Sequence, residues 1–183
     1  MMAARKTTEG MLKLFMDFAR STPRFESLFN RVQLLECSSG RCVLALPVEE
    51  RHTNAFANLH GGLTASFIDF STSAVLLAMP PEFDSGVSVD LNVSYLGAVN
   101  EGQYSHRRNQ KLQICNQSNY SAIVNVCDTV VAEALVERRG RQFAFTSARL
   151  SRQSDNAVIA LGRHTKAFPK KTMPDPRATE QQA

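Results

Sequence analysis

The sequence predicts an α+β fold in which an antiparallel sheet wraps around one long central helix. Residues 61–79 form a segment whose only charged side chain is Asp69, and Pro80 follows directly. Residues 87–95 alternate apolar and polar side chains, which is typical of a β-strand. Further strand-like segments lie before and after these two. Because a helix that is apolar nearly all round must be covered, this order indicates a sheet curled around it.

The first sixty residues predict one helix and one hairpin. Apolar residues recur at helical spacing over 11–18, in a helix that we expect to end before Pro23. Residues 32–36 and 41–48 are predicted strands around a Ser-Ser-Gly turn. Residues 49–59 then form a polar loop rich in Asn and His that leads to the long helix.

The second half predicts four more strands after the helix. Pro80 and Pro81 end the helix, because proline cannot continue it. The predicted strands are 87–95, 129–137, 142–152 and 158–166, and the turn 138–141 joins the second to the third.

We expect one domain over residues 24–168, with an N-terminal helical extension at 1–23 and a disordered tail at 169–183. Residues 103–127 do not fit this pattern, since they are rich in Asn, Gln and Ser and contain no acid. A connection of that length is unusual in a compact domain. We therefore expect an insertion there, either a surface segment or a segment absent from the mature protein.

Composition argues against nucleic acid as a partner. The chain has 183 residues, a formal net charge of +4 and a pI near 9.0. However, the basic residues form no single stripe, Trp is absent and no nucleic-acid recognition motif is present. Local binding of a phosphate or carboxylate and an ordinary solvated basic surface remain alternatives.

The sequence predicts a cytoplasmic or mitochondrial protein with no membrane span. Its start is basic, but Glu9 and Asp17 soon follow and no apolar signal region appears. The helix at 61–79 carries Asp69 and five Ser or Thr residues, so we interpret it as a core helix.

The four cysteines are Cys37, Cys42, Cys115 and Cys127, and they have neither zinc-site spacing nor a C-x-x-C pair. We expect reduced thiols, with Cys37 facing Cys42 across the first hairpin.

The long helix and its start carry the residues that suggest chemistry. Asp69 is a carboxylate in a segment composed for burial, and a buried carboxylate is costly unless it is paired or functional. Gly61 and Gly62 leave unhindered N–H groups at the positive end of the helix dipole. An anion hole and a shielded acid are two parts of an acyl-transfer site. The structural alternative is that Asp69 only caps a hydrogen-bond network with Ser66 or Ser73.

Several motifs in order resemble a known family. They are His52-Thr53-Asn54, Leu59-His60-Gly61-Gly62-Leu63-Thr64-Ala65, Asp69, Gly86-Val87-Ser88-Val89-Asp90-Leu91-Asn92, Phe143-Ala144-Phe145-Thr146-Ser147 and Gly162-Arg163-His164-Thr165-Lys166. Together they resemble the hotdog-fold acyl-CoA thioesterases, and within them the acyl-coenzyme A thioesterase 13 group (thioesterase superfamily member 2), related to bacterial phenylacetate-pathway thioesterases. The resemblance covers nearly all of residues 24–166 apart from the insertion. Ala167 departs from the His of that group.

The resemblance implies roles for five residues. Asp69 would act as general base or water-activating group, and Ser88 would help to place the water. Asn54 and the backbone N–H of Gly61 would polarise the thioester carbonyl. His60 would orient the substrate or assist the thiolate leaving group. From the residues alone, Asn54 could instead stabilise its loop, and Ser88 could be an ordinary solvated serine.

The resemblance also implies where coenzyme A is contacted and how the chain assembles. The contact residues would be Tyr95, Leu96, Gly97, Ala98, Val99 and Asn100, together with Arg138, Arg139, Gly140, Arg141, Gln142 and Phe143. The basic turn could equally be a solvated hairpin tip. Active sites would lie at the interface of a homodimer, commonly within a dimer of dimers. No metal or separate cofactor is expected, because coenzyme A is part of the substrate.

The expected function is hydrolysis of medium- to long-chain acyl-CoA to fatty acid and coenzyme A. A non-catalytic acyl-CoA binding module of the same fold is the main alternative, and the retained Asp69 argues against it. A hotdog dehydratase would need an Asp/His pair on a different loop, which we do not find.

Overall fold

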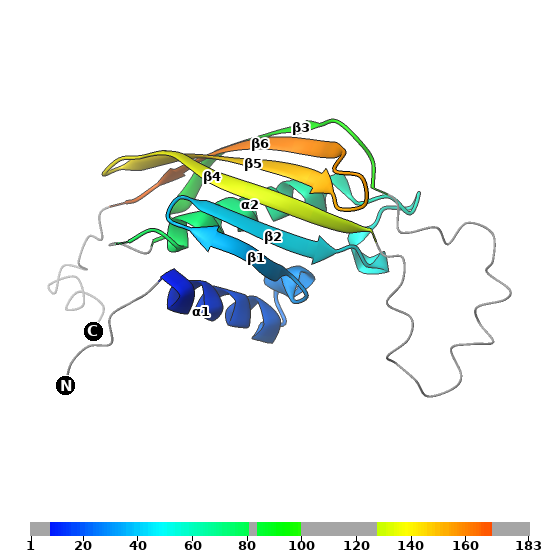
Figure 1. The fold of residues 1–183 in the computed structure, drawn as a ribbon, viewed down its shortest axis with the longest axis horizontal. Helices are drawn as coiled ribbons and strands as arrows, with labels where there is room; N and C mark the ends of the chain where they lie inside the picture. Colours follow the sequence, from blue (N-terminus) through cyan, green and yellow to red (C-terminus); the bar gives the residue numbers. More distant parts are fainter. Residues whose placement is uncertain (1–7, 81–83, 100–127, 170–183) are drawn as a thin grey trace, which may run out of the picture.

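A six-stranded antiparallel sheet curls around the long helix α2 in the computed structural model, which describes residues 8–80, 84–99 and 128–169 (Figure 1). The elements in chain order are α1 (Thr8–Ser21), η1 (Phe25–Phe29), β1 (Gln33–Ser38), β2 (Arg41–Pro47), η2 (Glu50–His52), α2 (Gly61–Leu77), β3 (Val87–Tyr95), β4 (Thr129–Arg139), β5 (Phe143–Arg152) and β6 (Val158–Ala167). The strand order is β1-β2-β4-β5-β6-β3. The predicted α+β class and the sheet around a central helix are confirmed.

Most side chains of α2 are themselves buried, as the composition of this helix predicts. The buried apolar residues are Leu63, Phe67, Ile68, Phe70, Ala74, Val75 and Leu76. The helix ends at Leu77, two residues before the predicted end. Within the three described ranges, no helix is both long and apolar enough to cross a membrane.

The helix and β6 approach each other closely at Gly162. A Cβ added to Gly162 would lie 2.4 Å from Cγ2 of Ile68, and Ile68 is fully buried. Real Cβ atoms do not approach other atoms so closely, so only glycine fits here without a shift of Ile68. This contact fixes the distance between the next residue on the helix, Asp69, and the end of β6.

The predicted N-terminal helix is also confirmed, and its apolar face packs into the core. Leu12, Met16 and Ala19 are buried, and the ring of Phe15 lies 4.6 Å from that of Phe70 between centroids. Phe29 of η1 packs on α2 as well, with its ring centroid 4.7 Å from that of Phe70. These rings fill the space between α1, η1 and α2.

The two hairpins differ in how well they were predicted. Cys37 and Cys42 are register partners in the β1–β2 hairpin, as expected, with their Sγ atoms 2.7 Å apart as free thiols. The predicted turn at 138–141 is wrong at its start. Arg138 and Arg139 belong to β4, where they pair with Phe145 and Ala144, because a register shift after Val136 lets the pairing continue.

The sheet has two edges, β1 and β3. Strand β3 pairs with β6 on one side, and most of its residues are exposed. The predicted insertion at 103–127, Asn100, Cys115, Cys127 and the tail from residue 170 lie outside the described residues.

Candidate active site

Asp69 lies on the side of α2 that faces the ends of β6 and β3. Its Oδ1 accepts a hydrogen bond from Lys166 Nζ at 2.9 Å and a longer one from Ser73 Oγ at 3.4 Å. Ser66, the other serine expected near it, donates instead to the Gly62 carbonyl at 2.8 Å. The carboxylate is therefore held from β6 and from its own helix.

The predicted burial of Asp69 is wrong for the single chain. Its side chain is 46% exposed. Ser66, Asp69 and Ser73 share one side of the helix at spacings of three and four residues, and all three are half-buried. The described sheet does not cover this side, so the carboxylate opens onto a surface beside the edge strand β3.

Lys166 connects Asp69 to Ser88. Its Nζ donates to Ser88 Oγ at 3.1 Å as well as to Asp69, while its side chain is only 5% exposed. Ser88 is exposed on β3, yet the lysine joins it to the acid of α2. The structure thus brings together two of the predicted catalytic residues through Lys166, which the sequence analysis placed in a family motif but gave no catalytic role.

His164 completes this cluster. Its side chain is fully buried, with Nδ1 2.7 Å from Thr72 Oγ1 and 3.5 Å from Asp69 Oδ1. Burial, and secondarily the charge of Lys166, lowers the pKa of His164 from 6.5 to about 4, so the ring is neutral near pH 7. Within the described residues, Nε2 is buried and has no hydrogen-bond partner.

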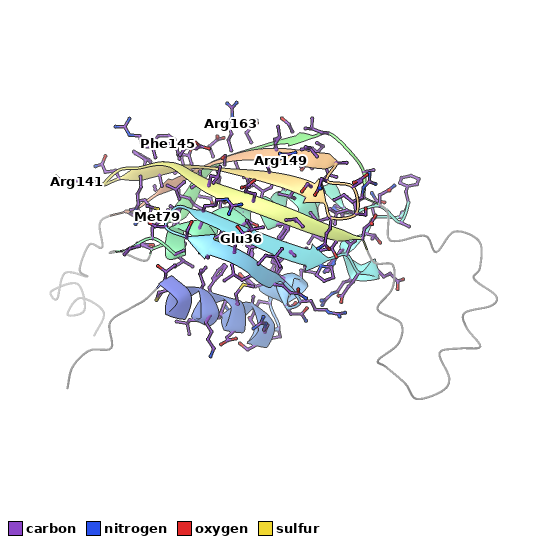
Figure 2. All side chains as sticks on the ribbon, in the orientation of Figure 1. Glu36, Met79, Arg141, Phe145, Arg149 and Arg163 are labelled. Carbon is purple, nitrogen blue, oxygen red and sulfur yellow. The ribbon has the colours of Figure 1, made fainter. Side chains whose placement is uncertain are left out.

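The alternation of residues along β6 could have identified Lys166 and His164 from the sequence. Gly162, His164 and Lys166 alternate along β6 on the face that meets α2, whereas Arg163 points away from α2 on the outer face of the sheet (Figure 2). The run of basic residues therefore belongs to two faces.

His60 and Gly61 form the start of α2. His60 is the N-cap, and its Nδ1 accepts the Gly62 N–H at 2.9 Å. Gly61 is the first helical residue, so its N–H lacks an intrahelical partner and stays available to an anion. The hydroxyl of Tyr95 donates to the Gly61 carbonyl at 3.1 Å. Tyr95 thus lies beside the glycine turn.

Asn54 lies in the loop that leads to this helix start. Its Oδ1 accepts the N–H groups of Phe56 at 2.9 Å and Asn58 at 3.2 Å, so the loop-stabilising alternative does operate. Those bonds fix the carboxamide, and its Nδ2 is left to donate elsewhere. Thr53 pairs with Leu59 across the same loop.

His52 from the same motif is structural. It is buried, its Nδ1 accepts the Glu49 N–H at 3.0 Å, and its Nε2 lies 2.9 Å from the Leu28 carbonyl. Burial lowers its pKa, so the neutral ring anchors the loop that carries Asn54.

One chain therefore carries two separate groups of site residues. Asp69, Ser88, Lys166 and His164 form the acid group, and Asn54, His60 and Gly61 form the glycine-turn group. Eight residues separate Gly61 from Asp69 along α2, which is about 12 Å at the helical rise. Within a single chain the two groups therefore lie apart along α2.

The predicted coenzyme A contacts also divide into two places. The β4–β5 turn borders a hollow of about 540 Å³ lined by Met79, Asp84, Arg139, Gly140, Arg141 and Phe168. The guanidinium carbon of Arg139 lies 4.2 Å from the centroid of the Phe168 ring, and Arg141 stands at the tip of the hairpin (Figure 2).

The segment from Tyr95 to Val99 lies at the opposite end of β3, about 26 Å from Val87 at the strand rise per residue. Tyr95 and Leu96 are exposed, but Val99 is 1% exposed within the core, which is against a side-chain contact with a ligand. A single chain therefore does not bring the two predicted contact segments together.

Comparison with known proteins finds relatives that are named as thioesterases. No protein-family model matches the chain. The chain is 32% identical over 142 residues to acyl-coenzyme A thioesterase 13 of Homo sapiens, covering 78% of this chain and 83% of the relative. Its fold is similar to the solved thioesterase superfamily member 2 of zebra fish, with a TM-score of 0.70 and 26% identity over 90% of this chain and 99% of that one. A thioesterase of Streptococcus pneumoniae solved with coenzyme A has the same fold, with a TM-score of 0.63 and 16% identity over 86% of this chain and 96% of that one.

Proposed function

Because the chain belongs to the acyl-coenzyme A thioesterase 13 family and is a thioester hydrolase, we propose that it hydrolyses medium- to long-chain acyl-CoA, with Asp69 activating the attacking water. One observation carries the assignment of Asp69. Its carboxylate is half-exposed, yet it is held by a buried ammonium group that also holds Ser88. A carboxylate so placed can reach a water molecule at the surface and remains fixed in orientation.

We propose that each complete site is built from two copies of the chain. The acid group of one copy would face the glycine-turn group of the other, since about 12 Å of helix separates them within one copy. A two-fold arrangement satisfies this requirement twice, because a two-fold interface repeats every contact.

The edge strand β3 supports this arrangement. It offers an unpaired edge nine residues long, and Val87 and Val89 on it are 54% and 58% exposed. An exposed apolar edge of that length invites pairing with another strand. Antiparallel pairing of two β3 strands would also place Tyr95 of one copy near Val87 of the other. The β4–β5 turn and the segment from Tyr95 would then meet in one coenzyme A site.

In the proposed reaction, Asp69 takes a proton from water as the water oxygen bonds to the thioester carbonyl carbon. The carbonyl electron pair moves onto oxygen, where the Asn54 Nδ2–H and the Gly61 N–H of the second copy stabilise it. The carbonyl then re-forms, the C–S bond breaks, and the coenzyme A thiolate leaves and takes the proton from Asp69. His60 would orient the substrate or assist that departure.

These contributions are sufficient for useful catalysis without a cofactor. A positioned carboxylate base contributes about 10²–10⁴-fold. One oxyanion donor contributes roughly 10²–10³-fold. We place the reaction in the cytoplasm or mitochondria.

A preference for medium or long acyl groups requires an apolar surface on the protein that binds the acyl group. The rings of Phe15, Phe29 and Phe70 pack on one another in the core, so they do not line a tunnel within one chain. Leu91 and Tyr95 are 36% and 56% exposed on the face of β3 that Ser88 shares, where they pair with His164 and Ala160, and they offer such a surface instead. An acyl chain lying there would be covered by the second copy.

The test is a panel of acyl-CoAs of graded length, with released thiol as the signal. We expect Asp69→Asn to lower kcat by roughly 10²-fold or more. Asp17→Asn is the matched control, because it makes the same change at an exposed carboxylate of α1. If the unaltered protein released no thiol from any acyl-CoA that it binds, it would be a binding module and not the proposed hydrolase.

A further inference from the structure

We infer that Lys166 is a positioning residue for this hydrolysis, holding Asp69 aligned with Ser88, an inference that rests on the function proposed above. Its ammonium group donates to Asp69 Oδ1 at 2.9 Å and to Ser88 Oγ at 3.1 Å. These two acceptors come from α2 and from β3, so one side chain of β6 joins three elements at the point where water must be placed.

The burial of Lys166 makes this role specific. Its side chain is 5% exposed, whereas that of Asp69 is 46% exposed. An ammonium group so buried is costly to desolvate unless a carboxylate and further acceptors compensate it. It also cannot reach a ligand at the surface, so a role in holding phosphate is not supported. Its effect on catalysis must pass through the two side chains that it contacts.

The surroundings of Asp69 show what Lys166 adds. The charged or titratable groups near this carboxylate are Lys166 and His164 of β6, and Asp90 of β3 acts on His164. Burial and Lys166 together lower the pKa of His164 to about 4, so His164 brings no positive charge near pH 7. Lys166 is then the cation, among the described residues, that pairs with the proposed base.

The geometry predicts that removing Asp69 and removing Lys166 destabilise the fold by different amounts. Without Lys166, the half-exposed carboxylate can still be hydrated. Without the charge of Asp69, a buried ammonium group keeps only neutral acceptors. We therefore expect Asp69→Asn to lower the melting temperature more than Lys166→Met does. The double variant should melt above Asp69→Asn, because it removes the uncompensated charge.

Kinetics of Lys166→Met provide the direct test, with Lys13→Met, an exposed lysine of α1, as the matched control. We expect kcat to fall roughly 10- to 100-fold with little change in KM, because Lys166 aligns groups and does not touch substrate. Lys166→Arg should recover part of kcat, which also covers the case in which Lys166→Met fails to fold.

The double variant separates positioning from general structural damage. In the Asp69→Asn background, Lys166→Met should change kcat less than twofold, since residues that act as one unit are not additive. Unchanged kcat in folded Lys166→Met, with Asp69→Asn inactive, would overturn the role of Lys166 alone. Full activity in Asp69→Asn would overturn the proposed base as well.

Discussion

Gly162→Ala tests the contact between α2 and β6 that sets the spacing of the acid group. The new Cβ would lie 2.4 Å from Cγ2 and 2.9 Å from Cδ1 of Ile68, which is 1.0 Å and 0.5 Å inside the ordinary contact range that starts at 3.4 Å. Ile68 is fully buried and cannot move into solvent. Over-packing of this kind costs typically about 1–3 kcal/mol. For a chain of this length, each 1 kcal/mol lowers the melting temperature by roughly 2–4 °C.

The assay is thermal and urea unfolding at one fixed protein concentration, because assembly makes stability concentration-dependent. Gly97→Ala is the matched control, since its added Cβ would find its nearest atom at 3.4 Å. Ile68→Ala in the Gly162→Ala background should cost less than the sum of the two single changes, because the new methyl group occupies the space that the isoleucine leaves. Equal stability of the Gly162→Ala and Gly97→Ala variants would refute the reasoning.

Three further results are expected. The pKa of His164 falls from 6.5 to about 4 on folding. Its contribution to the free energy of unfolding is therefore complete above pH 6.5 and is lost as pH falls toward 4, on the order of 3 kcal/mol in total. Urea midpoints between pH 7 and pH 4.5 should depend on pH less steeply in His164→Asn than in the unaltered protein. His60→Ala should cost about 1 kcal/mol as a lost N-cap, and His60→Asn should restore stability without restoring kcat if the ring also serves the site. Burial raises the pKa of the Cys37 and Cys42 thiols, so in a chain whose other two cysteines are serine, both should react with an aromatic disulfide reagent far more slowly when folded than in urea; equal rates would contradict their burial.

Local patterns were enough to predict the main elements of the fold. A segment whose one charged residue is Asp69, followed by a proline, predicts the helix at 61–77. Alternation of apolar and polar residues predicts the strand at 87–95, because side chains of a strand point to opposite faces in turn. The start of β5 was displaced by one residue, and Arg138 and Arg139 were assigned to the turn. A register shift in a hairpin depends on pairing with the opposite strand and leaves no clear local signal.

The site was predictable only in part, for a related reason. Asn54, Gly61 and Asp69 stand out by residue type and by motif, and the structure places each at a defined point of the loop or the helix. Lys166 belongs to a quoted motif but was given no catalytic role, because beside Arg163 it looks like a solvated surface residue. Its burial arises from β6 meeting both α2 and β3, which are distant in sequence.

The exposure of Asp69 was mispredicted because helix composition does not report which side of the helix the sheet of one chain leaves open. The same observation explains why the two groups of site residues, predicted as one site, lie apart. Both facts are accounted for by the proposed site built from two copies.

The most direct test of the shared site is complementation between two impaired variants. Asn54→Asp keeps the Oδ1 that holds the loop but removes the Nδ2 donor, and Asp69→Asn removes the base. Mixed dimers purified through two different tags contain one site with both residues intact and one site with neither. They should show about half of the activity of the unaltered dimer, whereas each variant by itself is nearly inactive. Mixed dimers as inactive as their parents would contradict a site shared between two copies of this chain.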